Sequence, residues 1–326
     1  MIVSPVIALV KSSVPIIWLD TSIIFYMTRW KLGKKIDTAQ RERVSFLYDS
    51  IYYLTRNKKL ICPLADQREE MWKGRADCLQ IMLELSLGIK TIYSELVKEY
   101  QTRQFMDAFI NKREQVEIKY LDYFHRDPYK QLSDNSRIIV SVDLGLIEKP
   151  TEIKKRRLNQ RDKLENLRNS IMQKGILYEE QLEKEFKSEL DTIAYLLNKS
   201  LQDEFPVSNF FAISDLLSKY LEYWTQLNGK VDDLITFFNS SYYRKIPFHN
   251  ISCQMWAKIL TQNDPIKSGH IMDIDYASSA IPYVNLFITD KYMKKIICDL
   301  ELDKSYKSMV LNISELGKVE KYFKDL

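Results

Sequence analysis

Ile16–Ile17–Trp18–Leu19–Asp20–Thr21–Ser22 places four large apolar residues in an unbroken run that ends at an aspartate. A short continuous apolar run is typical of a strand that is buried on both faces in a parallel sheet. Ligands of open α/β sheets bind outside the carboxyl ends of the strands, and Asp20 would stand at such an end. The alternative is that Asp20 caps the next helix, because Asp, Thr and Ser are preferred N-cap residues. This segment by itself leaves both roles open.

The same pattern returns near the C-terminus of the chain. The apolar run Val284–Asn285–Leu286–Phe287–Ile288–Thr289 ends at Asp290, and a basic helix start follows it. If the two strands are parallel neighbours, the carboxylates of Asp20 and Asp290 converge at one edge of the sheet. The recurrence favours a common site over two unrelated helix caps.

The residues after the first strand alternate between helix and strand patterns. Gln40–Asn57 has apolar residues at helical spacing and is predicted to be an amphipathic helix. Lys59–Leu64 is predicted to be a second strand that Pro63 closes. A helix is then expected from Ala65, with Asp66 as its N-cap and Glu69 in a capping-box-like position. This order indicates a βαβ unit, and therefore a parallel sheet with a right-handed crossover.

Long helical patterns dominate the middle of the chain. We therefore expect residues 1–76 and 205–326 to form an α/β core and residues 77–204 to form a mostly helical insertion or cap. The strongest basic cluster lies in this insertion: Lys154, Lys155, Arg156, Arg157 and Arg161. Such a cluster is usually a solvated helix face, and Asp162 and Glu165 dilute its charge. Phosphate binding is the less frequent explanation.

A second candidate for nucleic-acid contact is the aromatic and basic patch before Pro247. It consists of Tyr242, Tyr243, Arg244 and Lys245. Aromatic rings can stack bases while the cations hold phosphates. An ordinary loop is the more frequent explanation for a patch of this kind.

Composition excludes several classes of function. The chain has 326 residues, of which 45% are hydrophobic and 28% charged, so a globular protein with a substantial core is expected. Eight glycines and no G-x-G-x-x-G or G-x-x-x-x-G-K-[ST] motif argue against glycine-rich phosphate loops. The four cysteines and three histidines are scattered, which argues against a disulfide framework, a zinc site or a Ser/His/Asp triad. A net charge of +4 is too small to identify a partner.

The first ten residues are apolar, and the first basic residue, Lys11, comes after them. A secretory signal peptide has the opposite order, with its cationic region first. No apolar run approaches the length that a bilayer span requires. The expected location is therefore cytoplasmic, with no membrane partner.

A turn into a helix precedes the C-terminal strand. Asp273 and Asp275 lie in the first turn of this helix, where the positive end of the helix dipole favours acids. Acidic residues thus stand at four strand ends or helix starts: Asp20; Asp66, Glu69 and Glu70; Asp273 and Asp275; Asp290. Carboxylates that converge repel one another unless cations bind between them. Ligand sets made of oxygen alone select Mg²⁺ or Mn²⁺, which can activate water for phosphodiester hydrolysis.

Leu19–Asp20–Thr21–Ser22 after an apolar strand resembles the opening of PIN-domain nucleases. Asp273-x-x-x-Ala277-x-x-Ala280, followed by a strand that ends at Asp290, is similar to the end of that domain. The resemblance covers about residues 14–72 and 247–326, and it implies a PIN-like parallel-sheet α/β/α core that holds an acidic metal-binding quartet. It assigns these acids as Asp20; Glu70, with Glu69 and more weakly Asp66 as alternatives; Asp273, with Asp275 as a close competitor; and Asp290. Thr21, Ser22 and Thr289 would orient the carboxylates.

This resemblance implies a Mg²⁺- or Mn²⁺-dependent endoribonuclease acting on single-stranded RNA. Two alternatives stay open from the sequence. One is a DNase for single strands or flaps on the same fold, and the other is a catalytically silent binding or scaffold module. The insertion would recognise RNA, bind an inhibitor or activator, or join a second copy of the chain. A defence effector, a toxin and an RNA-processing enzyme are all compatible with these features.

Overall fold

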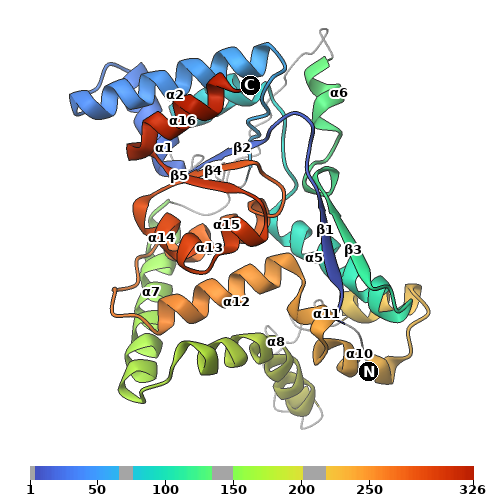
Figure 1. Cartoon of the computed structure of the whole chain (residues 1–326). Coiled ribbons are helices and arrows are strands. Elements are labelled where there is room, and N and C mark those ends of the chain that lie inside the picture. The colour runs from blue at the N-terminus through green and yellow to red at the C-terminus, as the bar shows by residue number, and fades with distance from the viewer. Residues whose placement is uncertain (1–3, 66–75, 134–149, 201–217) are drawn as a thin grey trace. The chain divides into compact units, whose positions relative to one another are not determined.

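The computed structural model describes residues 4–65, 76–133, 150–200 and 218–326 and has a mixed α/β fold (Figure 1). The chain divides into two compact units. One, here called the α/β unit, comprises residues 9–97, 118–163 and 267–326. The other, the helical unit, comprises residues 1–8, 98–117 and 164–266.

The α/β unit is built on a parallel sheet. Three strands pair in the order β2-β4-β5: β2 (Ile17–Leu19), β4 (Leu286–Thr289) and β5 (Met309–Asn312). β2 pairs in parallel with β4 in the register Leu19↔Ile288, which meets the condition under which the two aspartates converge at one sheet edge.

Isolated parallel bridges continue this sheet beyond β2. Ile16 bridges to Ile61, and Leu64 bridges to Lys90. The predicted strand Lys59–Leu64 is reduced to these bridges, since Pro63 has no N–H to donate. The extended segments that follow β2 in the chain lie on one side of it, and β4 pairs on its other side. The strand order therefore reverses between β2 and β4, and open α/β sheets bind their ligands at such a topological switch point.

Helices cover both faces of this sheet (Figure 1). Ile17, Leu19, Leu286 and Ile288 point to one face and join a single apolar core with four helices. These helices are α1 (Thr21–Lys31), α2 (Thr38–Arg56), α4 (Ala76–Ser86) and α16 (Leu316–Lys324). The sequence-based division places α4 in the insertion, whereas α4 packs against α1 and α2.

The alternate residues of the strands face the other layer. The rings of Trp18 and Phe287 stack with centroids 4.3 Å apart, and Tyr276 approaches Trp18 at 5.9 Å. Tyr276 belongs to α13 (His270–Ala280), and α14 (Lys291–Asp299) with α15 (Leu302–Ser305) connects β4 to β5. The α/β unit therefore has three layers, with its sheet in the middle.

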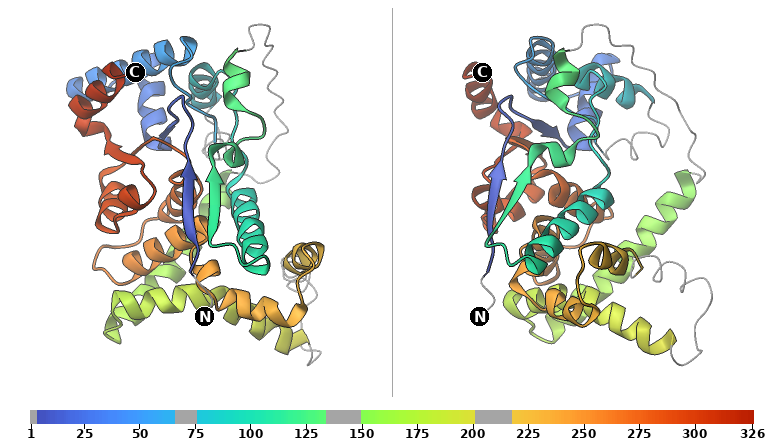
Figure 2. Two further views of the ribbon diagram at one scale, coloured as in Figure 1. Left: turned by 45° about the vertical axis from the view of Figure 1, so that its right-hand side comes forward. Right: turned by 90° about the vertical axis from the view of Figure 1, so that its right-hand side faces the viewer.

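The helical unit has an aromatic core. Its fully buried side chains include Phe105, Trp224, Phe237 and Tyr243, and α12 packs along α8. Helices of this unit include α8 (Tyr178–Ser200), α10 (Val231–Phe238), α11 (Ser241–Arg244) and α12 (Pro247–Leu260). Residues of α5 (Ser94–Ile110) and of α7 (Pro150–Gln173) are divided between the two units. The α/β unit also contains α6 (Pro128–Ser133) and the short 3₁₀ helices η1 (Tyr120–Tyr123) and η2 (Ile313–Glu315). β1 (Val6–Val10) and β3 (Gln115–Lys119) form a separate two-stranded sheet (Figure 2).

The boundaries expected from the sequence, 76/77 and 204/205, differ from those of the two units, and the second lies outside the described residues. The division into 1–76 with 205–326 and 77–204 stays a prediction. None of the described helices combines the length and the apolar character that a membrane crossing requires.

Candidate carboxylate site at the sheet edge

Asp20 follows the last residue of β2 and begins α1. Its Oδ1 accepts a hydrogen bond from the backbone N–H of Ser22 at 2.7 Å, which is an N-cap contact. Its Oδ2 accepts one from the hydroxyl of Thr289 at 3.3 Å. Asp20 is 8% exposed and Thr289 only 2%. Capping and a place at the sheet edge are thus compatible, because the two carboxylate oxygens serve different partners.

Asp290 stands at the end of the neighbouring strand. Its Oδ1 accepts a hydrogen bond from the backbone N–H of Met293 at 2.8 Å and caps α14. Since Leu19 pairs with Ile288, Asp20 is level with the residue just before Asp290. The predicted convergence of these two acids at one sheet edge is confirmed.

A pocket of about 500 Å³ opens at this edge, wholly within the α/β unit. Three carboxylates line it: Asp20, Asp273 and Asp290. The structure also brings Thr21 and Ser22 to the pocket, whereas Thr289 reaches it through its hydrogen bond to Asp20. Five of the residues that the PIN-like resemblance assigns therefore share one hollow, although they come from three separate segments of the chain.

The two aspartates that the sequence left as alternatives, Asp273 and Asp275, point in different directions from α13. Asp273 lines the pocket, and Asp275 is absent from its lining. Two residues along an α-helix turn the side chain by about 200°, so the two cannot face the same hollow. Gly269 is next to Asp273 in the lining, since a Cβ added at Gly269 would lie 3.4 Å from the Oδ2 atom of Asp273. The geometry selects Asp273.

The predicted second acid is Glu70, with Glu69 and Asp66 as alternatives. All three lie outside the described residues, so their relation to the pocket stays a prediction. Within the described ranges, no group of three His, Cys, Asp or Glu side chains is arranged to hold a metal ion.

The chemistry of the pocket nevertheless suits a hard divalent cation. Its acidic donors are carboxylate oxygens, which Mg²⁺ and Mn²⁺ prefer. The hydroxyl oxygen of Thr21 is buried beside them and has no hydrogen-bond partner in the described part of the chain. Asp20, Asp273 and Asp290 are therefore the residues that would hold such an ion.

Cationic and aromatic residues form the rest of the pocket. Arg157 of α7 and Lys267 line it together with His270, whose ring stacks on Tyr292 with centroids 4.7 Å apart. Nδ1 of His270 accepts a hydrogen bond from the backbone N–H of Lys267 at 3.3 Å, so the neutral ring carries its proton on Nε2. Neither His270 nor Lys267 was among the predicted site residues. The spacing of three residues between His270 and Asp273 was the available signal.

One further carboxylate at this sheet edge was missed, and its surroundings give it a different role. Glu315 follows β5 and accepts hydrogen bonds from the backbone N–H and the amide of Asn312 at 3.1 and 3.0 Å. Burial would raise the pKa of Glu315, but ion pairs with Lys294 and Lys318 and the Asn312 N–H lower it to about 2. Its charge is already compensated, so it fixes the end of β5.

The predicted basic cluster is divided by the structure. Lys154, Lys155 and Arg156 are exposed, Arg157 lines the pocket, and Arg161 forms an ion pair with Asp162 at 2.6 Å. Within this cluster, Arg157 belongs to the candidate site, and Lys154, Lys155 and Arg156 form a solvated surface.

The patch at Tyr242–Lys245 lies in the helical unit, and its contacts are structural. Tyr242 and Tyr243 are 3% and 1% exposed, so their rings have no face for a base to stack on. Arg244 forms an ion pair with Glu183, and Lys245 donates to the carbonyl of Pro5 at 2.8 Å. The expected loop is wrong, because Ser241–Arg244 is the short helix α11, and its contacts are those of a packed segment rather than of a nucleic-acid surface.

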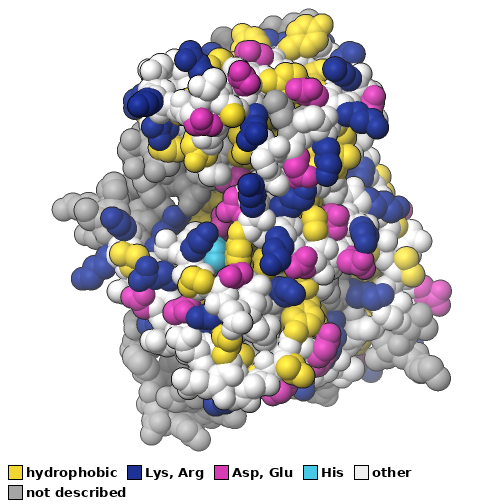
Figure 3. Space-filling model, turned by 60° about the vertical axis from the view of Figure 1, so that its left-hand side comes forward, with side chains coloured by type: hydrophobic (Ala, Val, Ile, Leu, Met, Phe, Trp, Pro, Cys, Tyr) yellow, Lys and Arg dark blue, Asp and Glu magenta, His cyan; other side chains and the backbone are white. Residues whose placement is uncertain are grey.

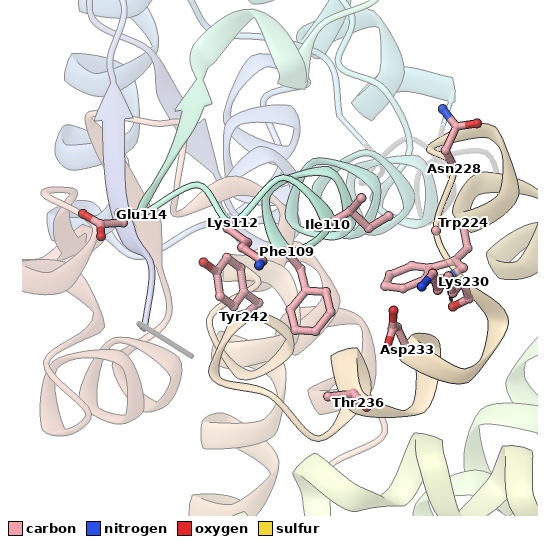
Figure 4. Close-up of a pocket in the computed structure, with 11 residues that line it drawn as sticks. Phe109, Ile110, Lys112, Glu114, Trp224, Asn228, Lys230, Asp233, Thr236 and Tyr242 are labelled. Carbon is pink, nitrogen blue, oxygen red and sulfur yellow. Dashed lines mark hydrogen bonds between the residues drawn. The ribbon is translucent and has the colours of Figure 1, made fainter. Parts of the chain in front are cut away.

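The helical unit has a hollow of its own, of about 630 Å³ (Figure 4). Phe109 and Tyr242 lie side by side in it, with Trp224 across from them. The indole N–H of Trp224 donates to the backbone carbonyl of Lys230 at 2.7 Å, and the hydroxyl of Tyr242 donates to the backbone carbonyl of Arg113 at 2.9 Å. The polar atoms of these rings are thus used within the fold.

Comparison with protein-family models, with curated proteins and with solved structures gives no match to this chain. Its function therefore has to be argued from the geometry of the carboxylate pocket and from the short sequence resemblance.

Proposed function

We propose that this chain is a Mg²⁺- or Mn²⁺-dependent, PIN-like nuclease that hydrolyses phosphodiester bonds, with single-stranded RNA as the expected substrate. The observation that carries the proposal is the meeting of Asp20, Asp273 and Asp290 in one pocket at the switch point between β2 and β4. The two ends of the resemblance to PIN-domain nucleases supply these same three acids.

Each residue of the pocket has a role in this proposal. Asp20, Asp273 and Asp290 would supply carboxylate oxygens to a divalent ion, which when bound would activate a water and neutralise charge on the leaving oxygen. The Thr289 hydroxyl and the Ser22 N–H keep the Asp20 carboxylate in one orientation. No side-chain nucleophile is required, so the protein mainly positions and neutralises its substrate.

The test measures cleavage of labelled single-stranded RNA with Mn²⁺, with EDTA, and with the Asp20→Asn variant. We expect cleavage by the unmodified protein and Mn²⁺ that is lost in the other two conditions. Asp49→Asn is the matched control, because Asp49 is exposed on α2 and does not line the pocket. An Asp20→Asn protein that cleaves as fast as the unmodified chain would exclude this mechanism.

Deoxyribose substrates are tested in parallel, since nothing in the pocket separates ribose from deoxyribose chemistry. Cleavage of single-stranded or flap DNA but not RNA would assign the chain to a DNase on the same site. The metal dependence and the Asp20→Asn control keep the same meaning in either case.

A catalytically silent binding module is favoured by one observation: Asp20 and Asp290 each cap a helix. Mn²⁺ titration with calorimetry separates the two functions. The nuclease requires Mn²⁺ binding that weakens in Asp20→Asn and Asp290→Asn, whereas a silent module binds no Mn²⁺ in this way.

A further inference from the structure

Arg157 is separated by more than one hundred residues from each acid of the pocket, yet it lines the same hollow as Asp20 and Asp290. It comes from the predicted insertion, which contributes to the pocket through the N-terminal half of α7. Its side chain is half-buried, unlike the exposed Lys154, Lys155 and Arg156 around it. The insertion therefore takes part in the site itself.

Helical spacing extends this contact along α7. Lys154 and Arg161 lie three residues before and four residues after Arg157, which places all three on one stripe of the helix. Lys155 is two residues from Arg157 and so points to the opposite side. The stripe from Lys154 to Arg161 is about 10 Å long. That length exceeds a single phosphate group and suits a chain of phosphates.

The charge of the pocket explains why such a stripe is needed. Three carboxylates in one hollow repel a phosphodiester backbone. An arginine guanidinium can hold two phosphate oxygens at once with parallel hydrogen bonds. Lys and Arg side chains also surround acidic ones on the face drawn in Figure 3.

We propose that the Lys154–Arg157–Arg161 stripe of α7 binds the phosphate backbone of a single-stranded nucleic acid and leads it into the carboxylate pocket. This inference rests on the proposed nuclease function, because it names the surface that delivers the substrate to that site. Arg157 contacts the phosphate nearest the acids, and Lys154 and Arg161 contact its neighbours.

The experiment measures binding by fluorescence anisotropy of a labelled single-stranded RNA in EDTA, where a metal-dependent reaction cannot proceed. We expect Arg157→Gln to weaken binding by about 10-fold or more, as loss of a charged hydrogen-bond pair does. The slope of log affinity against log salt should fall by about 1 for each phosphate contact removed. Lys154→Gln should weaken binding less, and Lys155→Gln should leave it unchanged.

Parallel arms identify the ligand. Single-stranded RNA and single-stranded DNA of equal length separate the two sugar chemistries, and inorganic phosphate tests whether one phosphate suffices. Competition by inorganic phosphate at micromolar concentration, or the absence of binding to either polymer, overturns the inference. If Lys155→Gln and Lys154→Gln weaken RNA binding equally, the inference is also overturned, because the loss would then reflect net charge and not the position of the side chain.

A structural role of Arg157 is distinguished by thermal unfolding. If Arg157 only compensates the pocket acids, Arg157→Gln lowers the melting temperature without changing RNA affinity, and the inference is wrong. Arg157→Lys, which keeps the charge but loses the planar fork, should restore part of the affinity. Failure of the proposed function appears elsewhere: RNA then binds through the stripe in EDTA but is not cleaved with Mn²⁺.

Discussion

The carboxylate pocket of the α/β unit and the aromatic pocket of the helical unit differ in what their side chains do. The aromatic pocket is larger, about 630 Å³ against about 500 Å³. Its rings pack on one another: the ring centroid of Phe109 lies 5.5 Å from that of Tyr242 and 6.0 Å from that of Trp224. The carboxylate pocket instead collects ionisable groups from separate segments of the chain. Convergence of charge at a sheet edge, and not the size of a hollow, therefore marks the candidate site.

The aromatic pocket depends on close approach of the backbone to a ring. A Cβ added at Gly229 would lie 2.5 Å from Nε1 of Trp224, which is fully buried. The wall of this pocket is thus a closely packed core, and changes there should affect stability before they affect any chemistry. We therefore expect substitutions in the carboxylate pocket to reduce activity, and substitutions in the aromatic pocket to reduce stability.

The largest effect is expected for Asp290→Asn. Asn is as good an N-cap as Asp, so α14 and the free energy of unfolding should change by less than about 1 kcal/mol. Loss of a metal-holding carboxylate should reduce the rate of RNA cleavage by about 1,000-fold, or roughly 4 kcal/mol. Cleavage kinetics with Mn²⁺ and a chemical denaturation curve measure both quantities. A destabilised variant that keeps its activity would mean that Asp290 acts as a cap alone.

Gly229→Ala should show the reverse. The new methyl group must displace the Trp224 ring, and overpacking of this kind costs about 2 kcal/mol of unfolding free energy. The cleavage rate per folded molecule should stay unchanged. Gly317→Ala is the matched control, since a Cβ there meets nothing within 4 Å. An equally destabilised control would show that the clash with Trp224 is not the cause.

Thr289→Val should have a smaller and purely functional effect. Valine keeps the shape of the buried side chain but removes the hydroxyl that donates to Oδ2 of Asp20. Loss of such an orienting hydrogen bond should reduce metal affinity or activity by about 10-fold. Thr289→Ser retains the hydroxyl and should behave like the unmodified protein. If the two variants were equally active, the Thr289 hydroxyl would have no role in the site.

The smallest effect concerns Glu315 and depends on pH. The pKa of Glu315 in the folded protein, about 2, lies below the ordinary value of 4.5. Its contribution to stability is therefore fully present above pH 4.5 and is lost as the pH falls toward 2. Lys318 is largely exposed, so its ion pair should contribute less than about 1 kcal/mol, and the less exposed pair with Lys294 should contribute most of the effect. The difference in melting temperature between the unmodified protein and Glu315→Gln should shrink between pH 6 and pH 3. A constant difference would contradict the assigned pKa.

Local patterns predicted the parts of the site that are close to strand ends. Asp20 and Asp290 were identifiable because a buried strand needs an unbroken apolar run, and its end is marked where a polar residue interrupts that run. The recurrence of the pattern made the pairing of β2 with β4 the condition for a shared site, and only the structure shows that the two strands pair. The sequence could not show that Arg157, and not its basic neighbours, lines the pocket. Helical periodicity shows which residues share a face of α7, but it does not show what that face contacts.

Aromatic residues gave the least reliable functional signal. Tyr242 and Tyr243 suggested a stacking surface beside Arg244, but both rings belong to the core of the helical unit. A ring that packs in a core and one that stacks a base occur in the same local sequences. Burial decides between them, and burial depends on elements that are distant in the chain.

The sequence by itself determined the α/β character of this protein, the two strands that end in aspartate, and the oxygen-only chemistry of the acids. These follow from hydrophobic periodicity and residue type, which act over a few residues. Only the tertiary structure decided that Asp273 rather than Asp275 faces the pocket, that Arg157 joins the acids, and that Glu315 is compensated by two lysines. These depend on helix rotation and on contacts between segments far apart in the chain, which no local pattern specifies.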